Sequence, residues 1–244
     1  LDLESLRDSL YNYTFKTLSD LDDAGLMPEY VQVGNEINPG FLLPQGNRWN
    51  GNEDNFIYLL NAAIDAVRDA GTTSAIKPEI IIHIAQPENV VNWFAGLEGL
   101  GMNDFDIIGI SYYYMWSNVT LDNLSDKISE IKSRYNTRVM VVETAYPFTT
   151  NNADSYPNIV TPGKILAPLF PATVQGQHDY LATLVQEIID GGGSGIMYWE
   201  PAWITSALNT QWGTGSAWDC NALFSFSGDV IKGMNYMTNE YIFK

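Results

Sequence analysis

Apolar runs rich in β-branched residues alternate along this chain with amphipathic segments of helical period, and this alternation constrains the fold more than any other feature. The apolar runs predict buried strands at residues 31–35, 79–84, 106–111, 138–142 and 195–199. The amphipathic segments predict helices at residues 3–24, 53–70, 88–100, 121–135 and 177–190. Strands and helices that alternate at this spacing form a parallel sheet with helices packed outside it.

Two details of this pattern are specific enough to compare with a structure. The first strand is expected to be buried on both faces, as in a parallel sheet. The first helix is expected to bury one apolar stripe, made of Leu3, Leu6, Leu10, Tyr13, Leu18 and Leu21.

The length of the chain bears on which parallel architecture it forms. A barrel of eight βα units takes about 250 residues, and this chain has 244 residues with only five predicted strands. We expect an α/β fold, a (β/α)8 TIM barrel, in which residues 1–244 are one partial catalytic domain with about five βα units, the three N-terminal units being missing. Open sheet edges invite aggregation. We therefore expect a fragment of a longer enzyme, a barrel completed by another segment, or a dimer.

The composition excludes several classes of function. The 12 Lys and Arg residues against 29 Asp and Glu give a formal net charge of −17, which argues against nucleic acid or an anionic membrane surface as a partner. No apolar run reaches the roughly 18 residues of a membrane span. The single cysteine, Cys220, excludes an intrachain disulfide and a zinc site built on cysteines. This balance suits a neutral substrate and a secreted, periplasmic or cell-surface protein.

Each predicted strand ends in polar or aromatic residues. These are Asn35-Glu36, His83, Ser111-Tyr112, Glu143 and Trp199-Glu200. In α/β barrels the carboxyl ends of the strands carry the catalytic groups. Glycosidic cleavage needs two carboxylates, one to protonate the leaving oxygen and one to attack the anomeric carbon or activate water. Glu36 and Glu143 would supply such a pair. The alternatives are that Asn35 and Glu36 cap a turn, or that either Glu is an ion-pair partner on the rim.

Six separated motifs, in order along nearly the whole chain, narrow the function further. They are Val33–Ile37, Asp106–Tyr113, Val142–Pro147, Gln175–Gln177, Tyr198–Trp203 and Gly215–Asp219. Together they resemble glycoside hydrolase family 53, the endo-β-1,4-galactanases of the clan A barrels. The resemblance implies retaining hydrolysis of β-1,4-galactosidic bonds in the galactan and arabinogalactan side chains of pectin. It also implies that Glu36 is the acid/base, that Glu143 is the nucleophile, and that the five strands correspond to barrel strands 4 to 8.

The resemblance also suggests which residues surround the two carboxylates. The expected substrate-binding residues are Asn35, His83, Tyr112, Trp116, Trp199 and Trp203. Asn35 would donate to the sugar 2-hydroxyl, and Tyr112 or Tyr113 would hydrogen-bond Glu143. His83 would contact substrate or Glu36, unless it is a rim histidine held only by its neighbours. Trp199 would form the floor of the cleaved sugar's subsite. Trp116 and Trp203 would stack on flanking sugars or simply pack their loops.

The long polar loop after Glu143, roughly residues 147–174, carries a second signal. Asn152, Asp154, Tyr156 and Asn158 alternate along it, and oxygens that converge in this way suit Ca²⁺. Bacterial members of the family bind calcium here, with a histidine where this chain has Tyr156. Ser216 and Asp219 match the ligands of the second loop. We therefore expect a structural Ca²⁺ held by residues 152, 154, 156, 158, 216 and 219, against the alternative of an ion-free loop rich in Asn and Asp.

Three readings of the function stay open at this point. The first is an endo-β-1,4-galactanase whose partner is a polysaccharide. The second is another clan A β-glycanase, such as a mannanase or a cellulase. The third is a galactan-binding fragment without turnover, because the chain carries only about five βα units.

Overall fold

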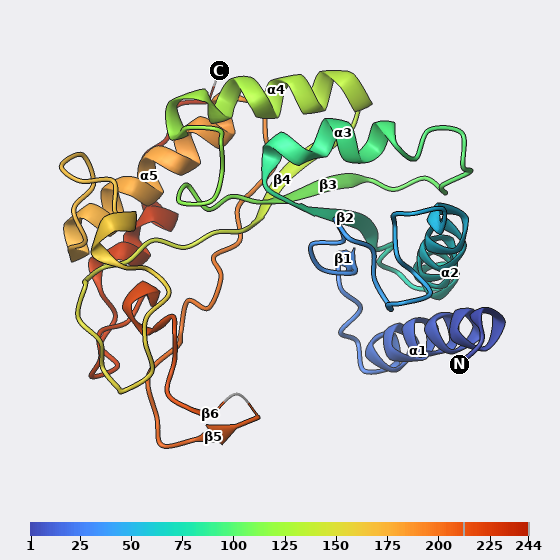
Figure 1. Ribbon diagram of the computed structural model, residues 1–244, viewed down its shortest axis with the longest axis horizontal. Coiled ribbons are helices and arrows are strands. Elements are labelled where there is room, and N and C mark those ends of the chain that lie inside the picture. The colour runs from blue at the N-terminus through green and yellow to red at the C-terminus, as the bar shows by residue number, and fades with distance from the viewer. Residues whose placement is uncertain (212, 244) are drawn as a thin grey trace. The chain divides into compact units, whose positions relative to one another are not determined.

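A computed structural model of the chain describes residues 1–211 and 213–243 (Figure 1). Its helices are α1 (Leu3–Asp23), α2 (Glu53–Gly71), α3 (Val90–Ala95), α4 (Leu124–Tyr135) and α5 (Val174–Asp190). Its strands are β1 (Tyr30–Val33), β2 (Glu79–Ala85), β3 (Ile107–Ser111), β4 (Arg138–Glu143), β5 (Asn209–Thr210) and β6 (Gly213–Thr214). Short 3₁₀ turns are η1 (Pro87–Asn89), η2 (Leu121–Asn123), η3 (Pro162–Lys164), η4 (Asp219–Asn221) and η5 (Lys232–Thr238). The predicted alternation of strands and helices is confirmed.

The first four strands form one sheet in the order β1-β2-β3-β4. The pairs β1/β2 and β2/β3 are parallel, with Val33 opposite Ile82 and Ala85 opposite Ser111. The fifth predicted strand runs parallel to β4 over a single bridge, between Val141 and Ile196. The backbone N–H of Val141 donates to the carbonyl of Gly195 over 3.1 Å there. This segment is therefore an extended stretch beside β4 rather than a regular strand. The short β5/β6 hairpin was not expected.

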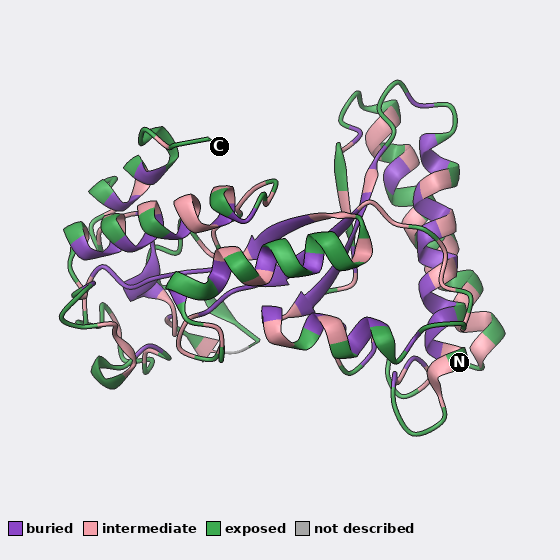
Figure 2. Ribbon diagram, turned by 90° about the horizontal axis from the view of Figure 1, so that it is seen from above, coloured by how far each residue is buried: buried purple, intermediate pink, exposed green. Residues whose placement is uncertain are grey.

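The described chain divides into two compact units. One comprises residues 1–111 and 130–140, and the other comprises residues 112–129 and 141–244. In the first unit the core is formed by β2, β3 and the apolar face of α2, all of which are largely buried (Figure 2). The prediction of a single domain over residues 1–244 stays a prediction.

The edge of the first unit is more exposed than the sequence pattern indicates. Strand β1 is buried only at Val33, whereas Tyr30 and Gln32 are exposed. The expectation of burial on both faces is wrong, because β1 pairs with β2 alone in the described sheet. The predicted apolar stripe of α1 is also wrong in part. Of its six members only Leu18 is buried, and Tyr13 is 73% exposed.

The reason for the exposure of α1 is its place in the first unit. The helix lies against α2 rather than against the sheet (Figure 1), and part of that contact is polar. Tyr11 donates a hydrogen bond to Asp69 (2.6 Å), and Tyr58 of α2 donates one to Glu4 (2.8 Å). A helix that packs on another helix buries one narrow side, so most of the predicted stripe is only half-buried.

In the second unit α5 begins three residues before its predicted start. The side chain of Thr173 accepts a hydrogen bond from the backbone N–H of Gly176 (3.0 Å), which caps the helix. Tyr180 of α5 stacks on Tyr146, with ring centroids 4.1 Å apart. Among residues 1–211 and 213–243, no helix combines the length and apolar character that a membrane span requires.

Candidate active site

The turn after β1 orients the first candidate carboxylate. Gly34 (φ 76°) and Glu36 (φ 45°) both have left-handed backbone conformations. Residues other than glycine adopt this conformation rarely and at some energetic cost. A Cβ on Gly34 would come within 2.5 Å of Ile37, a fully buried residue. The backbone N–H of Ile37 donates to the carbonyl of His83 (3.0 Å), which ties the turn to β2. The turn leaves Asn35 exposed and Glu36 half-buried.

A buried hydrogen-bonded network supports Glu36. Ser111, at the end of β3, donates its hydroxyl proton to Oε1 of Glu36 over 2.6 Å. The same hydroxyl lies 2.8 Å from Nε2 of His83, and the backbone N–H of Glu36 donates to Nδ1 of His83 (3.3 Å). Because Nδ1 accepts and the single Ser111 proton goes to Glu36, the imidazole proton belongs on Nε2. The side chain of Asn35 lies 3.2 Å from Nδ1 as well.

His83 is neutral near pH 7 in this setting. Its side chain is buried, and burial lowers the pKa of His83 to about 4. The predicted contact of His83 with Glu36 is therefore present, through a backbone N–H and through Ser111. Ser111 itself was not among the predicted site residues, although the sequence pattern placed it at the end of a strand, where catalytic groups are expected.

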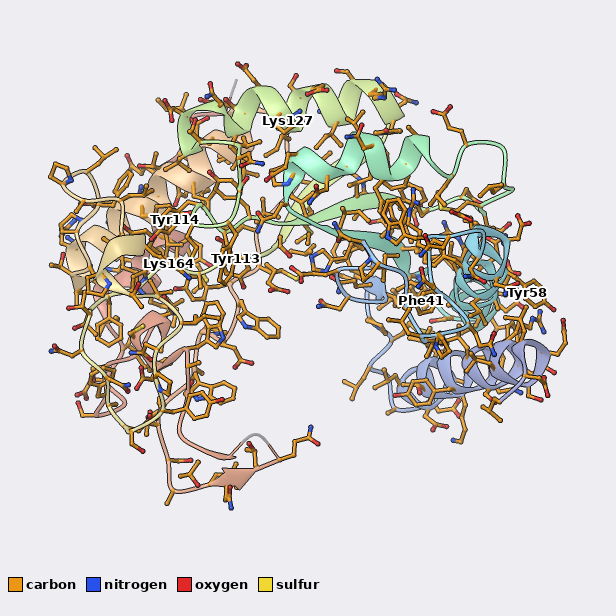
Figure 3. The ribbon with its side chains drawn as sticks, viewed as in Figure 1. Phe41, Tyr58, Tyr113, Tyr114, Lys127 and Lys164 are labelled. Carbon is orange, nitrogen blue, oxygen red and sulfur yellow. The ribbon has the colours of Figure 1, made fainter. Side chains whose placement is uncertain are left out.

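The second candidate carboxylate, Glu143, ends β4 in the other unit. The hydroxyl of Tyr113 donates to Oε1 of Glu143 over 2.9 Å (Figure 3). Tyr112 points elsewhere, because its hydroxyl donates to the carbonyl of Val119 (3.0 Å) and its side chain is fully buried. The prediction of Tyr112 as a substrate-binding residue is wrong for this reason. The sequence left open which of the two tyrosines holds Glu143, and the structure selects Tyr113.

The backbone around Glu143 is fixed to its neighbouring segments. The N–H of Tyr112 donates to the carbonyl of Glu143 (2.8 Å), and the hydroxyl of Thr144 donates to the carbonyl of Tyr112 (2.7 Å). On the other side, the N–H of Trp199 donates to the carbonyl of Thr144 (2.8 Å). The segments that carry Glu143, Tyr113 and Trp199 are therefore held in register.

Two of the three predicted tryptophans line one pocket of the second unit. Trp199 and Trp203 are both partly exposed there, and the pocket has a volume of about 430 Å³. Trp218 and Tyr156 also line it. Trp116 is not part of this lining. Its ring lies edge-on to Trp218, with centroids 6.2 Å apart, and the ammonium of Lys164 lies 5.5 Å from its ring centroid (Figure 3).

Glu200 follows Trp199 and lines the same pocket, together with a neighbouring one of about 290 Å³ that Trp203 also lines. Burial raises the pKa of the Glu200 carboxyl. Trp218 was not predicted as a site residue, although it lies in the motif Gly215–Asp219. Its position beside the pocket follows only from the packing of two loops.

Three of the six predicted calcium ligands lie in one hydrogen-bonded cluster. Asp154 accepts hydrogen bonds from the backbone N–H groups of Tyr156 (2.6 Å) and Ser216 (2.8 Å). Asp219, which is buried, accepts one from the N–H of residue 153 (2.9 Å). The hydroxyl of Thr205 lies between the two carboxylates, 3.1 Å from Asp154 and 3.4 Å from Asp219. Thr205 was not predicted.

The other three predicted ligands differ among themselves. The side-chain amide of Asn152 donates to the carbonyl of Tyr156 (2.5 Å), so these two bind each other. The side chain of Tyr156 lines the tryptophan pocket. Asn158 donates to the carbonyl of Asn151 (3.2 Å), while its Oδ1 atom is buried and has no hydrogen-bond partner among the described residues.

Comparison with known proteins decides the family. The sequence profile of Glycosyl hydrolase family 53 matches residues 1–237. The chain belongs to this family. It is 43% identical over 245 residues to an arabinogalactan endo-β-1,4-galactanase of Cellvibrio japonicus, covering 100% of this chain and 64% of that protein. It is 38% identical to an uncharacterised protein from the bgaB 5′ region of Niallia circulans, with 96% and 66% covered. This family 53 chain thus spans less than two thirds of those two relatives.

Solved structures agree with the family. The GH53 catalytic domain of Ignisphaera aggregans superposes with a TM-score of 0.89 at 32% identity, covering 99% of this chain and 67% of that domain. A structure from a study of two fungal β-1,4-galactanases gives a TM-score of 0.79 at 29% identity, with 98% and 70% covered. A xylanase from Caldicellulosiruptor owensensis, at 15% identity and a TM-score of 0.61, shares the fold alone. The family 53 chain therefore has the (β/α)8 type of α/β fold.

Proposed function

We propose that the protein to which this chain belongs is an endo-β-1,4-galactanase that cleaves galactan and arabinogalactan with retention. The observation that carries the proposal is the 43% identity, over the whole chain, with a protein named for that activity. The two carboxylates that such a reaction needs lie in the turn after β1 and at the end of β4, and each has hydrogen-bonded support in its own unit.

In this proposal Glu143 is the nucleophile and Glu36 is the acid/base. Glu143 forms a bond to the anomeric carbon while the glycosidic C–O bond breaks, and Glu36 gives its proton to the departing oxygen. Glu36 then takes a proton from water, the water oxygen attacks the anomeric carbon, and the Glu143 carboxylate is released. The Tyr113 hydroxyl, donating to Oε1 of Glu143, stabilises the ionised form that attacks.

Ser111 and His83 set the direction of proton transfer at Glu36. The Ser111 hydroxyl occupies Oε1 of Glu36, which leaves Oε2 as the atom that carries the proton to substrate. His83 stays neutral and donates to Ser111 through Nε2, so the network adds no positive charge beside the acid. Asn35, exposed beside Glu36, is the donor proposed for the sugar 2-hydroxyl.

The substrate proposed is a neutral galactan chain. Trp199 and Trp203 supply flat, partly exposed rings in one pocket, and aromatic faces bind the apolar faces of sugar rings. The net charge of −17 does not oppose a neutral polysaccharide. We also propose that the protein is secreted, because polymeric galactan lies outside the cell.

A substrate panel tests the proposed activity. The full-length protein should release reducing sugars from β-1,4-galactan but not from β-mannan, cellulose or xylan. Proton NMR of the first products should show the β-anomer, as retention requires. Hydrolysis of mannan or cellulose in preference to galactan would replace the proposal by another clan A β-glycanase. Binding of galactan without release of products would replace it by a non-catalytic binding function.

We also propose that the loop cluster binds a structural Ca²⁺. The supporting observation is chemical: Oδ1 of Asp219 and Oδ1 of Asn158 are buried and without hydrogen-bond partners among the described residues, and oxygens of this kind suit a hard cation. Asp154 and the hydroxyl of Ser216 would complete the set with water. The carbonyl of Tyr156 is already bound by Asn152, so Tyr156 and Asn152 would contribute least.

Thermal unfolding with added CaCl₂ or EDTA tests this proposal. Calcium at about a hundred times its Kd should stabilise the fold by about 2.7 kcal/mol, and EDTA should remove that gain. Asp219→Asn should abolish the calcium-dependent shift in Tm. An unchanged Tm with both calcium and EDTA would contradict the proposal.

The last proposal concerns which strands of the eight-stranded family barrel the strands of this chain correspond to. We propose that β1 to β4 and the segment at residues 195–199 are equivalent to strands 4 to 8 of the eight-stranded barrel, as parts of a single catalytic domain. Sedimentation of the full-length protein measures its mass in solution. A monomer would mean that a further segment of the same chain completes the barrel, and a dimer would mean that a second copy does.

A further inference from the structure

One pocket in the first unit is lined by none of the predicted site residues. It is lined by Asn38, Pro39, Trp49, Asn89, Asn92 and Trp93, and its volume is about 330 Å³. That volume is in the range of small-molecule sites. No member of the lining carries an ionisable side chain. Two indole rings and three side-chain amides offer instead an apolar face with groups that both donate and accept hydrogen bonds.

The aromatic wall of this pocket is held rigidly from beneath. Trp49 is 48% exposed, and the guanidinium of Arg48 lies 4.0 Å from its ring centroid. Arg48 is itself buried, with only 2% of its surface exposed, and donates to the carbonyl of Trp93 over 2.7 Å. A cation stacked on one face fixes the indole. The ring is thus a platform whose remaining surface is open to a ligand without loss of side-chain freedom on binding.

The floor of the pocket rests on an aromatic cluster. The ring of Trp93 lies edge-on to Phe56, with centroids 5.8 Å apart, and Phe56 lies edge-on to Phe41 at the same separation. Phe41 belongs to the loop that also carries Trp49. Loop, helix α2 and helix α3 are therefore packed together under the pocket, so its shape is set before a ligand arrives.

The pocket is connected to the strand end that carries the candidate acid. The indole N–H of Trp93 donates to the carbonyl of Ile37 (3.2 Å), the residue after Glu36. Asn38 binds the backbone of Ala85 at both ends of its amide, over 2.7 and 3.1 Å. Asn89 donates to the same Ala85 carbonyl (2.8 Å). The walls are thus fastened to the carboxyl ends of β1 and β2, the edge of the sheet on which Glu36 lies.

From these contacts we propose that this pocket binds a neutral hexosyl unit of the galactan chain on the leaving-group side of the cleaved bond. The sugar's apolar face lies on Trp49, and its hydroxyls bind the amides of Asn89 and Asn92. An ionised ligand is disfavoured, because the lining offers no charged partner. The leaving-group side follows from the connection to Glu36, the residue proposed to protonate the departing oxygen. The inference rests on the proposed galactanase function.

Calorimetric titration with β-1,4-galactotetraose tests the pocket, using full-length protein in a Glu143→Gln background that prevents turnover. Trp49→Ala should weaken binding about tenfold or more, as expected for an aromatic anchor, and Trp49→Phe should restore part of the affinity. Asn92→Ala, an exposed substitution, should also weaken binding. Tyr13→Ala, which removes an exposed aromatic ring from α1 in the same unit, is the matched control and should bind like the parent.

The outcomes separate this inference from the function on which it rests. If the parent enzyme hydrolyses galactan while Trp49→Ala and Asn92→Ala bind galactotetraose like the parent, the pocket is not a sugar site and the galactanase proposal stands. If the parent neither binds nor hydrolyses galactan, both proposals fail. If Trp49→Ala does not fold, as judged by circular dichroism, Trp49→Phe and Asn92→Ala decide the question.

Discussion

At the scale of single residues, the two candidate carboxylates are supported in different ways. Glu36 sits in a left-handed turn and shares its Oε1 with the buried Ser111 hydroxyl. Glu143 ends a regular strand and is held by the phenol of Tyr113. A strained turn tends to persist where function requires a particular orientation. The hydrogen bond from a phenol favours the ionised form that a nucleophile needs.

Removing either carboxylate should abolish turnover and leave the fold intact. Glu36→Gln and Glu143→Gln keep the size of each side chain, and we expect each to lower kcat on galactan by roughly three orders of magnitude or more. Their Tm should stay close to that of the parent. The assay is galactan hydrolysis alongside thermal unfolding. Activity near the parent level in either variant would contradict the assignment of the pair.

The stability of the protein should depend on pH through His83. Burial lowers the pKa of His83 from 6.5 to about 4 in the folded state, so between these values the unfolded chain binds the extra proton. The contribution to stability is therefore complete above pH 6.5. It is lost as the pH falls toward 4, at about 1.4 kcal/mol per pH unit.

Replacing the imidazole isolates this contribution from the many carboxylates that also titrate. The free energy of unfolding in urea should be compared for the parent and His83→Gln across that pH interval. The difference between the two proteins should be constant above pH 6.5 and should shift in favour of the variant below it. A difference that does not change with pH would show that His83 titrates alike in both states.

At the scale of elements, a buried side-chain amide of α5 packs directly against the turn η5. Gln177 is fully buried, and its Nε2 donates to the carbonyls of Tyr146 (2.8 Å) and Ala222 (3.1 Å). Gly233 of η5 lies directly against it, because a Cβ there would come within 2.0 Å of the Gln177 Oε1 atom. The side chain of Tyr198 donates to the same Tyr146 carbonyl (3.0 Å). This contact connects the helix to the segment that carries Trp199.

Gly233→Ala should therefore destabilise the second unit. The added methyl group would displace a buried, hydrogen-bonded amide, and we expect a loss of about 1–3 kcal/mol in the free energy of unfolding. Gly163→Ala is the control, since a Cβ at that position meets nothing within 4 Å. Urea denaturation compares the two variants. Equal stability of both would contradict the close packing of Gly233 against Gln177.

At the scale of the whole molecule, the dominant property is negative charge. A formal net charge of −17 repels polyanions over about a Debye length, roughly 10 Å at moderate salt. Neutral galactan feels no such field. If the protein is a galactanase as proposed, this charge should disfavour the acidic backbone of pectin and leave its neutral galactan side chains unaffected.

Salt should consequently change galactan hydrolysis very little. We expect kcat/KM on galactan to vary by less than about twofold when the ionic strength rises about tenfold, because screening acts only on charged partners. Polygalacturonate, a polyanion, should not inhibit at low salt. Initial rates across a NaCl series measure this. A steep fall in kcat/KM with salt would indicate that an ionic contact binds the substrate.

Much of the candidate site could be predicted from local sequence, because strand ends are local features. Asn35, Glu36 and Glu143 each follow an apolar run, and such runs end where the parallel sheet ends. His83 lies near the end of its run, two residues before β2 ends at Ala85. The choice between Tyr112 and Tyr113 could not be made in the same way. Successive residues of an extended segment face opposite sides, so one of them must face Glu143. Which one does depends on the register with β4.

Which residues are buried, and which side chains line a pocket, depends on contacts between segments that are distant in the sequence. The apolar period predicted helix α1 correctly, yet most of its stripe is only half-buried because the helix packs on α2. Strand β1 reads as fully buried but lies at the edge of the described sheet. The contacts that Ser111, Trp218 and Thr205 make in the candidate sites are with neighbours far along the chain.

By itself the sequence determined the alternation of strands and helices, the residues at the strand ends and the family, since each depends on local period or on motif identity. Only the tertiary structure decided that Ser111 joins His83 to Glu36, that Tyr113 rather than Tyr112 holds Glu143, and that the Trp49 ring stands over buried Arg48. These are contacts across the fold. Their geometry follows from strand register and loop packing, which the pattern of residues along the chain does not encode locally.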